Sequence, residues 1–123
     1  AVFVTYDLIG SGAVQAIINA GREKDIKVYT IDGDEIGFQM LFDKEGPFYA
    51  TISQDVLSVG RISAEYVLKA IDGKADEVPY SANPDVALVS KTDLAFAVEK
   101  AKAKWGDDCL TRWNIDENTL LQK

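Results

Sequence analysis

Short apolar stretches alternate with amphipathic stretches along most of the chain. Residues 1–6, 27–32 and 48–53 are rich in β-branched and aromatic side chains, which predicts strands, and the first of them is expected to be buried on both faces. Between them, apolar residues recur at three- and four-residue steps over 8–20 and from about 35 to 42, which predicts helices. This alternation predicts an α/β fold with a mainly parallel sheet flanked by helices.

The second half of the chain continues the pattern. A long amphipathic helix is predicted over residues 55–73, a short apolar strand over 86–89, and a helix over 95–105 that Thr92 or Asp93 can cap. The remaining polar tail gives no clear prediction.

Polar side chains follow three of the predicted strands. Tyr6 and Asp7 come after the first, Asp32 ends the second, and Gln54 follows the third. Ligands of parallel α/β sheets bind beyond the carboxyl ends of the strands, so these four residues are the candidate ligand-binding residues. A carboxylate and an amide can bind paired hydroxyl groups, and a tyrosine ring can stack on a sugar.

The same residues also have a purely structural interpretation. Asp7 and Asp55 can cap helices, Asp32 and Gly33 can form a turn, and Tyr6 can end a core strand. The pattern alone leaves both interpretations open.

Composition narrows the function classes. The chain has 123 residues, enough for one compact domain, and its net charge of −7 with no concentrated basic stretch argues against direct binding of nucleic acid. No apolar run is long enough to cross a bilayer, and the amino terminus has no signal-peptide pattern.

Catalytic and metal-binding groups are scarce. The sequence has no histidine and one cysteine, Cys109, so imidazole-based triads and multi-cysteine metal sites are excluded. The acidic run 32–35 lacks the ligand spacing of an EF-hand, and the serines have no evident base to activate them. We expect no enzyme activity, no metal and no cofactor.

A nucleotide-binding α/β domain is a weaker alternative. Gly10 and Gly12 follow a strand, open a helix and precede Asp32 by about twenty residues, as in a dinucleotide-binding fingerprint. However, Gln15 occupies the third glycine position, and Gly10 comes too late for the tight turn. These glycines are better explained by close packing of the helix.

Four motifs in order resemble a known family. They are Val4 to Ala16, Gly21 to Gly33, Ala50 to Asp55, and Gly60 to Lys74. Together they make the chain similar to the carboxy-terminal part of ribose-type periplasmic binding proteins, whose type I fold is shared with lac-repressor-like regulators. The resemblance covers about residues 1–90 and implies a Rossmann-like lobe, present here as a fragment.

The resemblance also implies roles for single residues. The family's ligand-binding Asn, Asp and Gln correspond to Tyr6, Asp32 and Gln54. Tyr6 departs from the family's amide, which suggests a stacking or single-hydroxyl contact.

The implied function is non-catalytic capture of a sugar or related polyol by hinge closure between two lobes. The implied partners are an ABC-type import permease or a chemoreceptor, and the implied location is extracytoplasmic. The alternative within this resemblance is the effector domain of a lac-repressor-like transcriptional regulator. Residues 21–27 and 47–51 look more like the transport branch.

The resemblance finally implies a domain division. Residues 1–94 correspond to a partial carboxy-terminal lobe that includes a crossover helix, 55–73, and residues 95–123 form a helical extension. In an intact family member the crossover helix belongs to the other domain. We therefore expect exposed apolar surface and self-association of the fragment, for example as a homodimer.

Overall fold

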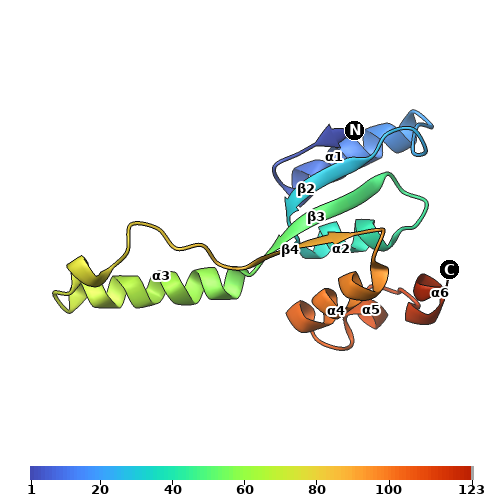
Figure 1. Cartoon of the computed structure of the whole chain (residues 1–123). Helices are drawn as coiled ribbons and strands as arrows, with labels where there is room; N and C mark the ends of the chain where they lie inside the picture. The colour runs from blue at the N-terminus through green and yellow to red at the C-terminus, as the bar shows by residue number, and fades with distance from the viewer. Residues whose placement is uncertain (123) are drawn as a thin grey trace. The chain divides into compact units, whose positions relative to one another are not determined.

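A four-stranded sheet organises most of the chain. In this computed structural model, which describes residues 1–122, the strands β1 (Val2–Phe3), β2 (Val28–Asp32), β3 (Phe48–Gln54) and β4 (Val86–Ser90) lie side by side in that order (Figure 1). The pairs β1–β2 and β2–β3 are parallel. Strand β4 runs against β3, since the amide beyond its end, Lys91 N, donates to Tyr49 O at the start of β3. The predicted mainly parallel α/β sheet is confirmed.

The chain separates into two compact units. The first contains residues 1–53 together with the residues from Ala87 onward, and the second contains residues 54–86.

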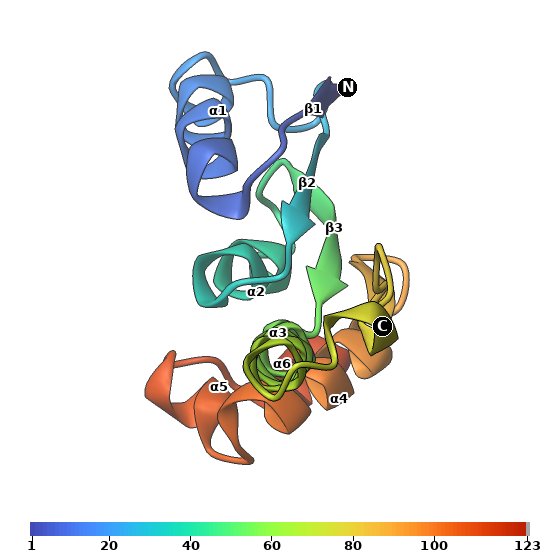
Figure 2. The same ribbon diagram turned by 90° about the vertical axis from the view of Figure 1, so that its left-hand side faces the viewer.

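In the first unit, helices α1 (Asp7–Asn19) and α2 (Glu35–Phe42) cover one face of the sheet (Figure 2). Asp34 caps α2 by accepting a hydrogen bond from Gly37 N at 2.8 Å. Asp7, in contrast, is the first residue of α1 rather than its cap; Tyr6 is the N-cap and makes no side-chain cap bond, so the predicted capping by Asp7 is wrong.

The opposite face of this sheet carries aromatic rings. Successive side chains of a strand point to opposite faces, and Tyr29 and Tyr49 pair across β2 and β3 with ring centroids 5.5 Å apart. Phe3, in register with Tyr29, is 63% exposed. The prediction that residues 1–6 form a strand buried on both faces is therefore wrong: only Val2–Phe3 is a strand, because it pairs along one edge with β2 alone.

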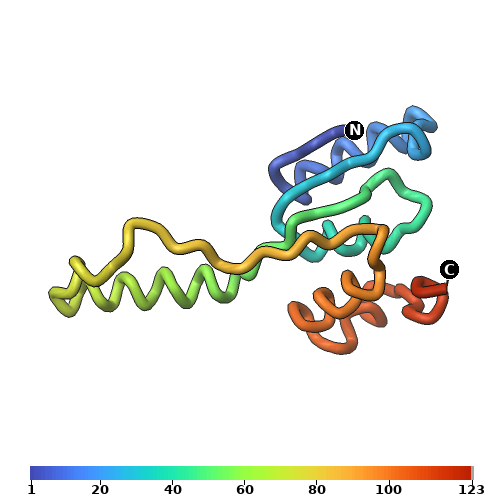
Figure 3. Tube along the Cα trace, in the orientation of Figure 1, coloured from blue at the N-terminus to red at the C-terminus, as the bar shows by residue number. Residues whose placement is uncertain are grey.

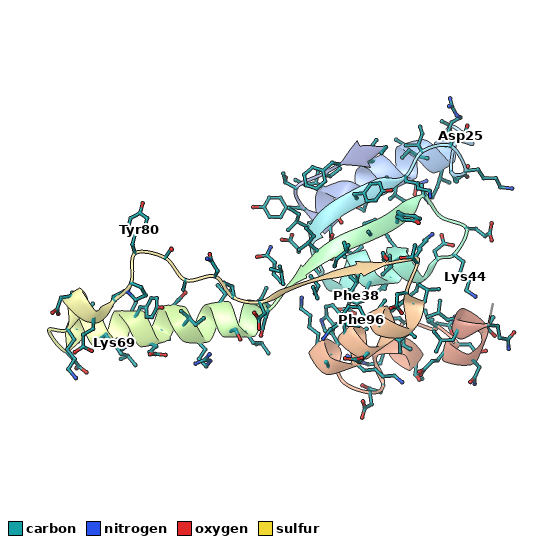
Figure 4. The ribbon with its side chains drawn as sticks, viewed as in Figure 1. Asp25, Phe38, Lys44, Lys69, Tyr80 and Phe96 are labelled. Atoms are coloured by element: carbon teal, nitrogen blue, oxygen red, sulfur yellow. The ribbon has the colours of Figure 1, made fainter. Side chains whose placement is uncertain are left out.

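The carboxy-terminal helices complete the core of the first unit. These are α4 (Leu94–Trp105), capped by Asp93, α5 (Cys109–Arg112) and α6 (Glu117–Leu121). Phe38 of α2 and Phe96 of α4 lie on the packed side of these helices (Figure 4), and Trp105 meets Phe38 edge to face at 5.0 Å. The buried apolar core comprises Val14, Ile17, Val28, Phe38, Leu41, Phe42, Phe48, Val89, Ala97, Val98, Ala101, Cys109, Leu110 and Leu120.

The second unit is a helix and the segment that returns along it. Helix α3 (Val56–Ile71) begins at Asp55, whose side chain accepts from Ser58 N at 3.0 Å, as predicted. After the short helix η1 (Ala75–Glu77) the chain runs back beside α3 (Figure 3), and Asp55 N donates to Asp85 O. None of the residues of α3 is buried, and Tyr80 on the returning segment points away from the helix (Figure 4).

Within residues 1–122, no helix is both long enough and apolar enough to span a bilayer.

Candidate functional site

The predicted site lies where β1 and β2 end. Tyr6, three residues beyond β1, is 54% exposed, and its backbone oxygen accepts from Gly10 N at 2.9 Å. The backbone of Tyr6 is thus part of the start of α1, and its exposed side chain is accessible to a stacking partner.

Asp7 lies next to Tyr6 but faces inward, with no exposed surface. Its Oδ1 accepts hydrogen bonds from the hydroxyl groups of Thr30 and Thr51, the latter at 2.8 Å. Its Oδ2 accepts from Asp34 N at 2.9 Å. Since both carboxylate oxygens are used internally, the prediction that Asp7 contacts a ligand is corrected: its role is inside the fold.

The loop after β2 has an uncommon backbone. Asp32 has φ of 130° and Gly33 has φ of 62°. Positive φ is rare for a residue other than glycine and requires support from the surroundings. A Cβ at Gly33 would lie 2.4 Å from the Cα of Ser53, so only glycine allows β3 to approach this closely. The half-buried Asp32 is therefore presented by a tightly constrained turn.

Asp34 adds a third carboxylate to this cluster. Burial raises the pKa of its carboxyl above the ordinary value of 3.8, and the hydrogen bond from Gly37 N acts in the opposite direction. The negative charges of Asp7 and Asp32 raise the same pKa further. The carboxyl edge of β2 is thus a region of concentrated negative charge.

A lysine from the carboxy-terminal part of the chain reaches the same loop. Lys104 of α4 donates from Nζ to Gly33 O at 2.6 Å. Trp113 donates from Nε1 to Glu35 in the first turn of α2. The loop is thus held from the side of β3 and from the carboxy-terminal helices.

Gln54 is the last residue of β3, half-buried, and the first residue of the second unit. Tyr6, Asp7 and Asp32 thus all belong to the first unit, and Gln54 is the first residue of the second.

The two glycines of the dinucleotide alternative differ in their surroundings. A Cβ at Gly10 would lie 2.6 Å from Cγ2 of Thr30, so this glycine is needed where α1 packs on β2. A Cβ at Gly12 would meet nothing within 4 Å, so close packing on a neighbour is confirmed for Gly10, while Gly12 has no such neighbour in the chain and a role on the ligand side stays a prediction. Neither glycine lies in a tight strand-to-helix turn, because both are inside α1.

Groups for chemistry other than binding are sparse in the described part of the chain. Among residues 1–122 no group of three or more His, Cys, Asp or Glu side chains is arranged to hold a metal ion. Cys109 is buried, and burial raises the pKa of its thiol, which keeps the sulfur in its unreactive protonated form. The arrangement at the strand ends can accept hydrogen bonds from hydroxyl groups and stack an apolar ring face.

Sequence reasoning missed Thr30, Thr51 and Lys104. The two threonines are opposite each other in the register of β2 and β3, and both are buried. A polar residue at the helix-facing position of two neighbouring strands is a signal that could have indicated a buried acceptor such as Asp7. Nothing in the local pattern around Lys104 indicates the loop it reaches.

Comparisons with known proteins agree with this geometry. Residues 1–75 match a family model described as a periplasmic binding protein domain. A fructose import binding protein of Bifidobacterium longum is 34% identical over 99 residues, which are 80% of this chain and 28% of that protein. The chain thus spans less than a third of that relative's length.

Solved structures give the same result. An ABC transporter solute-binding protein from Agrobacterium vitis with bound allitol is 28% identical, with a TM-score of 0.70 over 80% of this chain and 33% of its own. An ABC sugar transporter subunit from Rhodobacter sphaeroides is 29% identical, with a TM-score of 0.65 over 73% of this chain and 31% of its own.

A 5-methylthioribose transporter solute-binding protein from Thermotoga lettingae is 22% identical and shows the shared fold, with a TM-score of 0.68 over 98% of this chain and 34% of its own. Because this alignment takes in nearly the whole chain, the carboxy-terminal helices are part of the shared fold.

Proposed function

Because this chain belongs to the periplasmic binding protein family, we propose that it forms part of a solute-binding protein that captures a sugar or polyol for an ABC-type importer. The observation that carries the proposal is the constrained loop after β2, which presents Asp32 at the carboxyl edge of a parallel sheet. A carboxylate accepts hydrogen bonds from two neighbouring hydroxyl groups, which polyhydroxylated ligands provide.

Tyr6 and Gln54 complete the proposed contact set. Tyr6 offers an exposed ring for stacking on the apolar face of a ligand. Gln54, at the end of the next strand, offers an amide that can both donate to and accept from hydroxyl groups.

The proposed mechanism is binding without chemical change. Capture between two lobes makes more contacts in the closed state, and this differential affinity shifts the population toward closure. Family members are extracytoplasmic, and we place this protein there as well, with a transport permease or a chemoreceptor as its partner. The relatives named above are transport proteins, which favours import over the effector domain of a transcriptional regulator.

The domain division follows from the same proposal. We assign residues 1–94 to a partial carboxy-terminal lobe, with the helix over 55–73 as a crossover element, and residues 95–123 to a helical extension that packs on the core of this lobe. The exposed apolar side chains of α3, Leu57, Leu68 and Ile71 among them, support covering of this helix by another part of a longer protein. In the isolated 123-residue chain the same surface favours self-association as a homodimer.

The function is tested by a thermal-shift screen of the whole protein, as the cell makes it, against monosaccharides, polyols and nucleotides. A ligand that binds only the folded state raises the melting temperature. We expect a shift with at least one sugar or polyol, and loss of that shift in Asp32→Ala and Gln54→Ala.

The matched control is Asp25→Ala. Asp25 is an exposed aspartate paired with Arg22 in the loop before β2, and exposed ion pairs contribute little to stability. This variant should keep the full ligand-induced shift. A shift with nucleotides alone, or a sugar shift that Asp32→Ala leaves unchanged, would show the proposal to be wrong.

A further inference from the structure

The buried carboxylate of Asp7 lies directly beneath the loop that the proposed function uses. It has no exposed surface and is held by three donors from three different segments: Thr30 of β2, Thr51 of β3, and Asp34 N after β2. A Cβ at Gly37 would lie 2.1 Å from Asp7 Oδ2, so the carboxylate is also packed tightly against the first turn of α2.

Two hydrogen-bonded routes connect this carboxylate to the backbone of the loop. The first is direct, from Asp34 N to Asp7 Oδ2 at 2.9 Å. The second passes through Thr51, whose Oγ1 accepts from Gly33 N at 3.2 Å while its hydroxyl donates to Asp7 Oδ1 at 2.8 Å. Both residues that follow Asp32 are therefore tied to Asp7.

These ties hold a backbone that is unfavourable by itself. Asp32 has φ of 130°, a value that a side-chain-bearing residue keeps only when the surrounding structure imposes it. The bonds to Gly33 N and Asp34 N fix the two peptide units immediately after Asp32, and these units determine where its side chain points.

We propose that Asp7 is a positioning residue for ligand binding, which acts through Thr51 and Asp34 N to hold Asp32 in its binding orientation. This inference rests on the proposed function for its ligand, but the coupling between Asp7 and the loop is a property of the fold alone. Asp7 itself does not touch the ligand.

The first test is amide hydrogen exchange in the 123-residue chain, which needs no ligand. Asp7→Asn replaces one acceptor oxygen with an NH2 group that cannot accept, so a buried donor loses its partner. We expect the backbone amide of Asp34 or of Gly33 to exchange faster in Asp7→Asn than the loss of global stability alone would cause. Val98→Ala, a core truncation in α4 that removes none of the hydrogen bonds to the loop, supplies the comparison for the effect of lost global stability.

A second pair of variants keeps the proposal testable if Asp7→Asn does not fold. Thr30 and Thr51 are opposite each other, both buried, and both donate to Asp7, but only Thr51 also accepts from Gly33 N. Thr51→Val should therefore speed exchange at Gly33 N, and Thr30→Val should leave it close to wild type. Equal effects of the two substitutions, or exchange in Asp7→Asn no faster than in Val98→Ala, would overturn the proposal.

The second test is affinity in the whole protein for the sugar or polyol found in the thermal-shift screen. A buried donor without an acceptor shifts the equilibrium between the ordered loop and a relaxed loop by roughly a factor of ten. Because the ligand binds the ordered loop, Asp7→Asn should weaken ligand binding about tenfold or more. Val98→Ala should bind with wild-type affinity, and equal affinities of these two variants would overturn the proposal. Failure of the wild type to bind any sugar would instead refute the proposed function, and the exchange result would still decide the role of Asp7.

Discussion

At the scale of single residues, the capping hydrogen bond of Asp34 and its burial shift the pKa of its carboxyl in opposite directions. Its side chain caps α2 through Gly37 N, and its carboxyl is partly buried beside Asp7 and Asp32, which raises its pKa above 3.8. An acid whose pKa is raised on folding contributes stability that is fully present below the unfolded pKa and is lost as the pH rises through the folded pKa.

Asp34→Asn should therefore gain stability relative to wild type between about pH 4 and about pH 7, since asparagine keeps a capping oxygen without the charge. The matched control is Asp116→Asn, another helix cap, because hydrogen bonds from Thr119 and Asn118 lower the pKa of Asp116. Its contribution is present above the unfolded pKa and is lost only as the pH falls through the folded pKa, so between about pH 4 and about pH 7 its variant should show no such gain relative to wild type.

Urea unfolding of both variants at the two pH values measures this difference. Parallel behaviour of the two substitutions would contradict the opposite pKa directions.

The residue scale is also where sequence reasoning reached its limit. The candidate positions of Tyr6 and Asp32 follow from the rule that ligands bind beyond the carboxyl ends of strands. In the structure, Tyr6 lies three residues beyond the end of β1, and Asp32 is the last residue of β2. The inward orientation of Asp7 could not be predicted, because it depends on Thr30 and Thr51 lying opposite each other in the sheet register. Register is a tertiary property that spacing along one segment does not contain.

At the scale of secondary-structure elements, local pattern was more informative. Helices with a capping aspartate, α2, α3 and α4, begin within a residue or two of the predicted positions, because the cap is a local hydrogen bond. Strand β1 is shorter than predicted because its length depends on pairing with β2. Residues 95–123 were predicted only as a helical extension, and the separate short helices α5 and α6 were not, since their stability comes from packing against the core.

Helix α1 offers a prediction at this scale, because its two glycines differ in surroundings. Gly12→Ala adds a methyl group in open space within a helix and should stabilise the protein by about 0.5–1 kcal/mol. Gly10→Ala places a methyl group 2.6 Å from Thr30 Cγ2 and should destabilise it by about 1–3 kcal/mol through overpacking.

Chemical denaturation of both variants measures the two changes in unfolding free energy. A gain in stability from Gly10→Ala would mean that the contact between α1 and β2 is less close than the structure shows.

At the scale of the whole molecule, the two units differ in how much they bury. The first has a continuous core that includes β2, β3 and the carboxy-terminal helices, whereas α3 in the second has no buried residue. Local opening is easiest where few apolar side chains are buried.

Hydrogen exchange of the 123-residue chain should therefore show weaker protection in α3 than in β2 and β3. The expected pattern is exchange of α3 amides by local opening, at denaturant concentrations that leave the sheet protected. Equal protection of α3 and β3 would indicate that α3 is covered, for instance in a dimer, and sedimentation velocity at several concentrations would identify that case.

The bonds beneath the loop after β2 also determine when during folding the loop can acquire its shape. Asp7 lies 23 residues before Thr30 and 44 residues before Thr51, so these contacts close only after three distant segments have converged. A growing polypeptide that has emerged only as far as β2 has Asp32 but nothing to set its backbone. The loop is therefore a late product of folding, and a nascent chain should gain the ability to recognise its ligand only after β3 has joined the sheet.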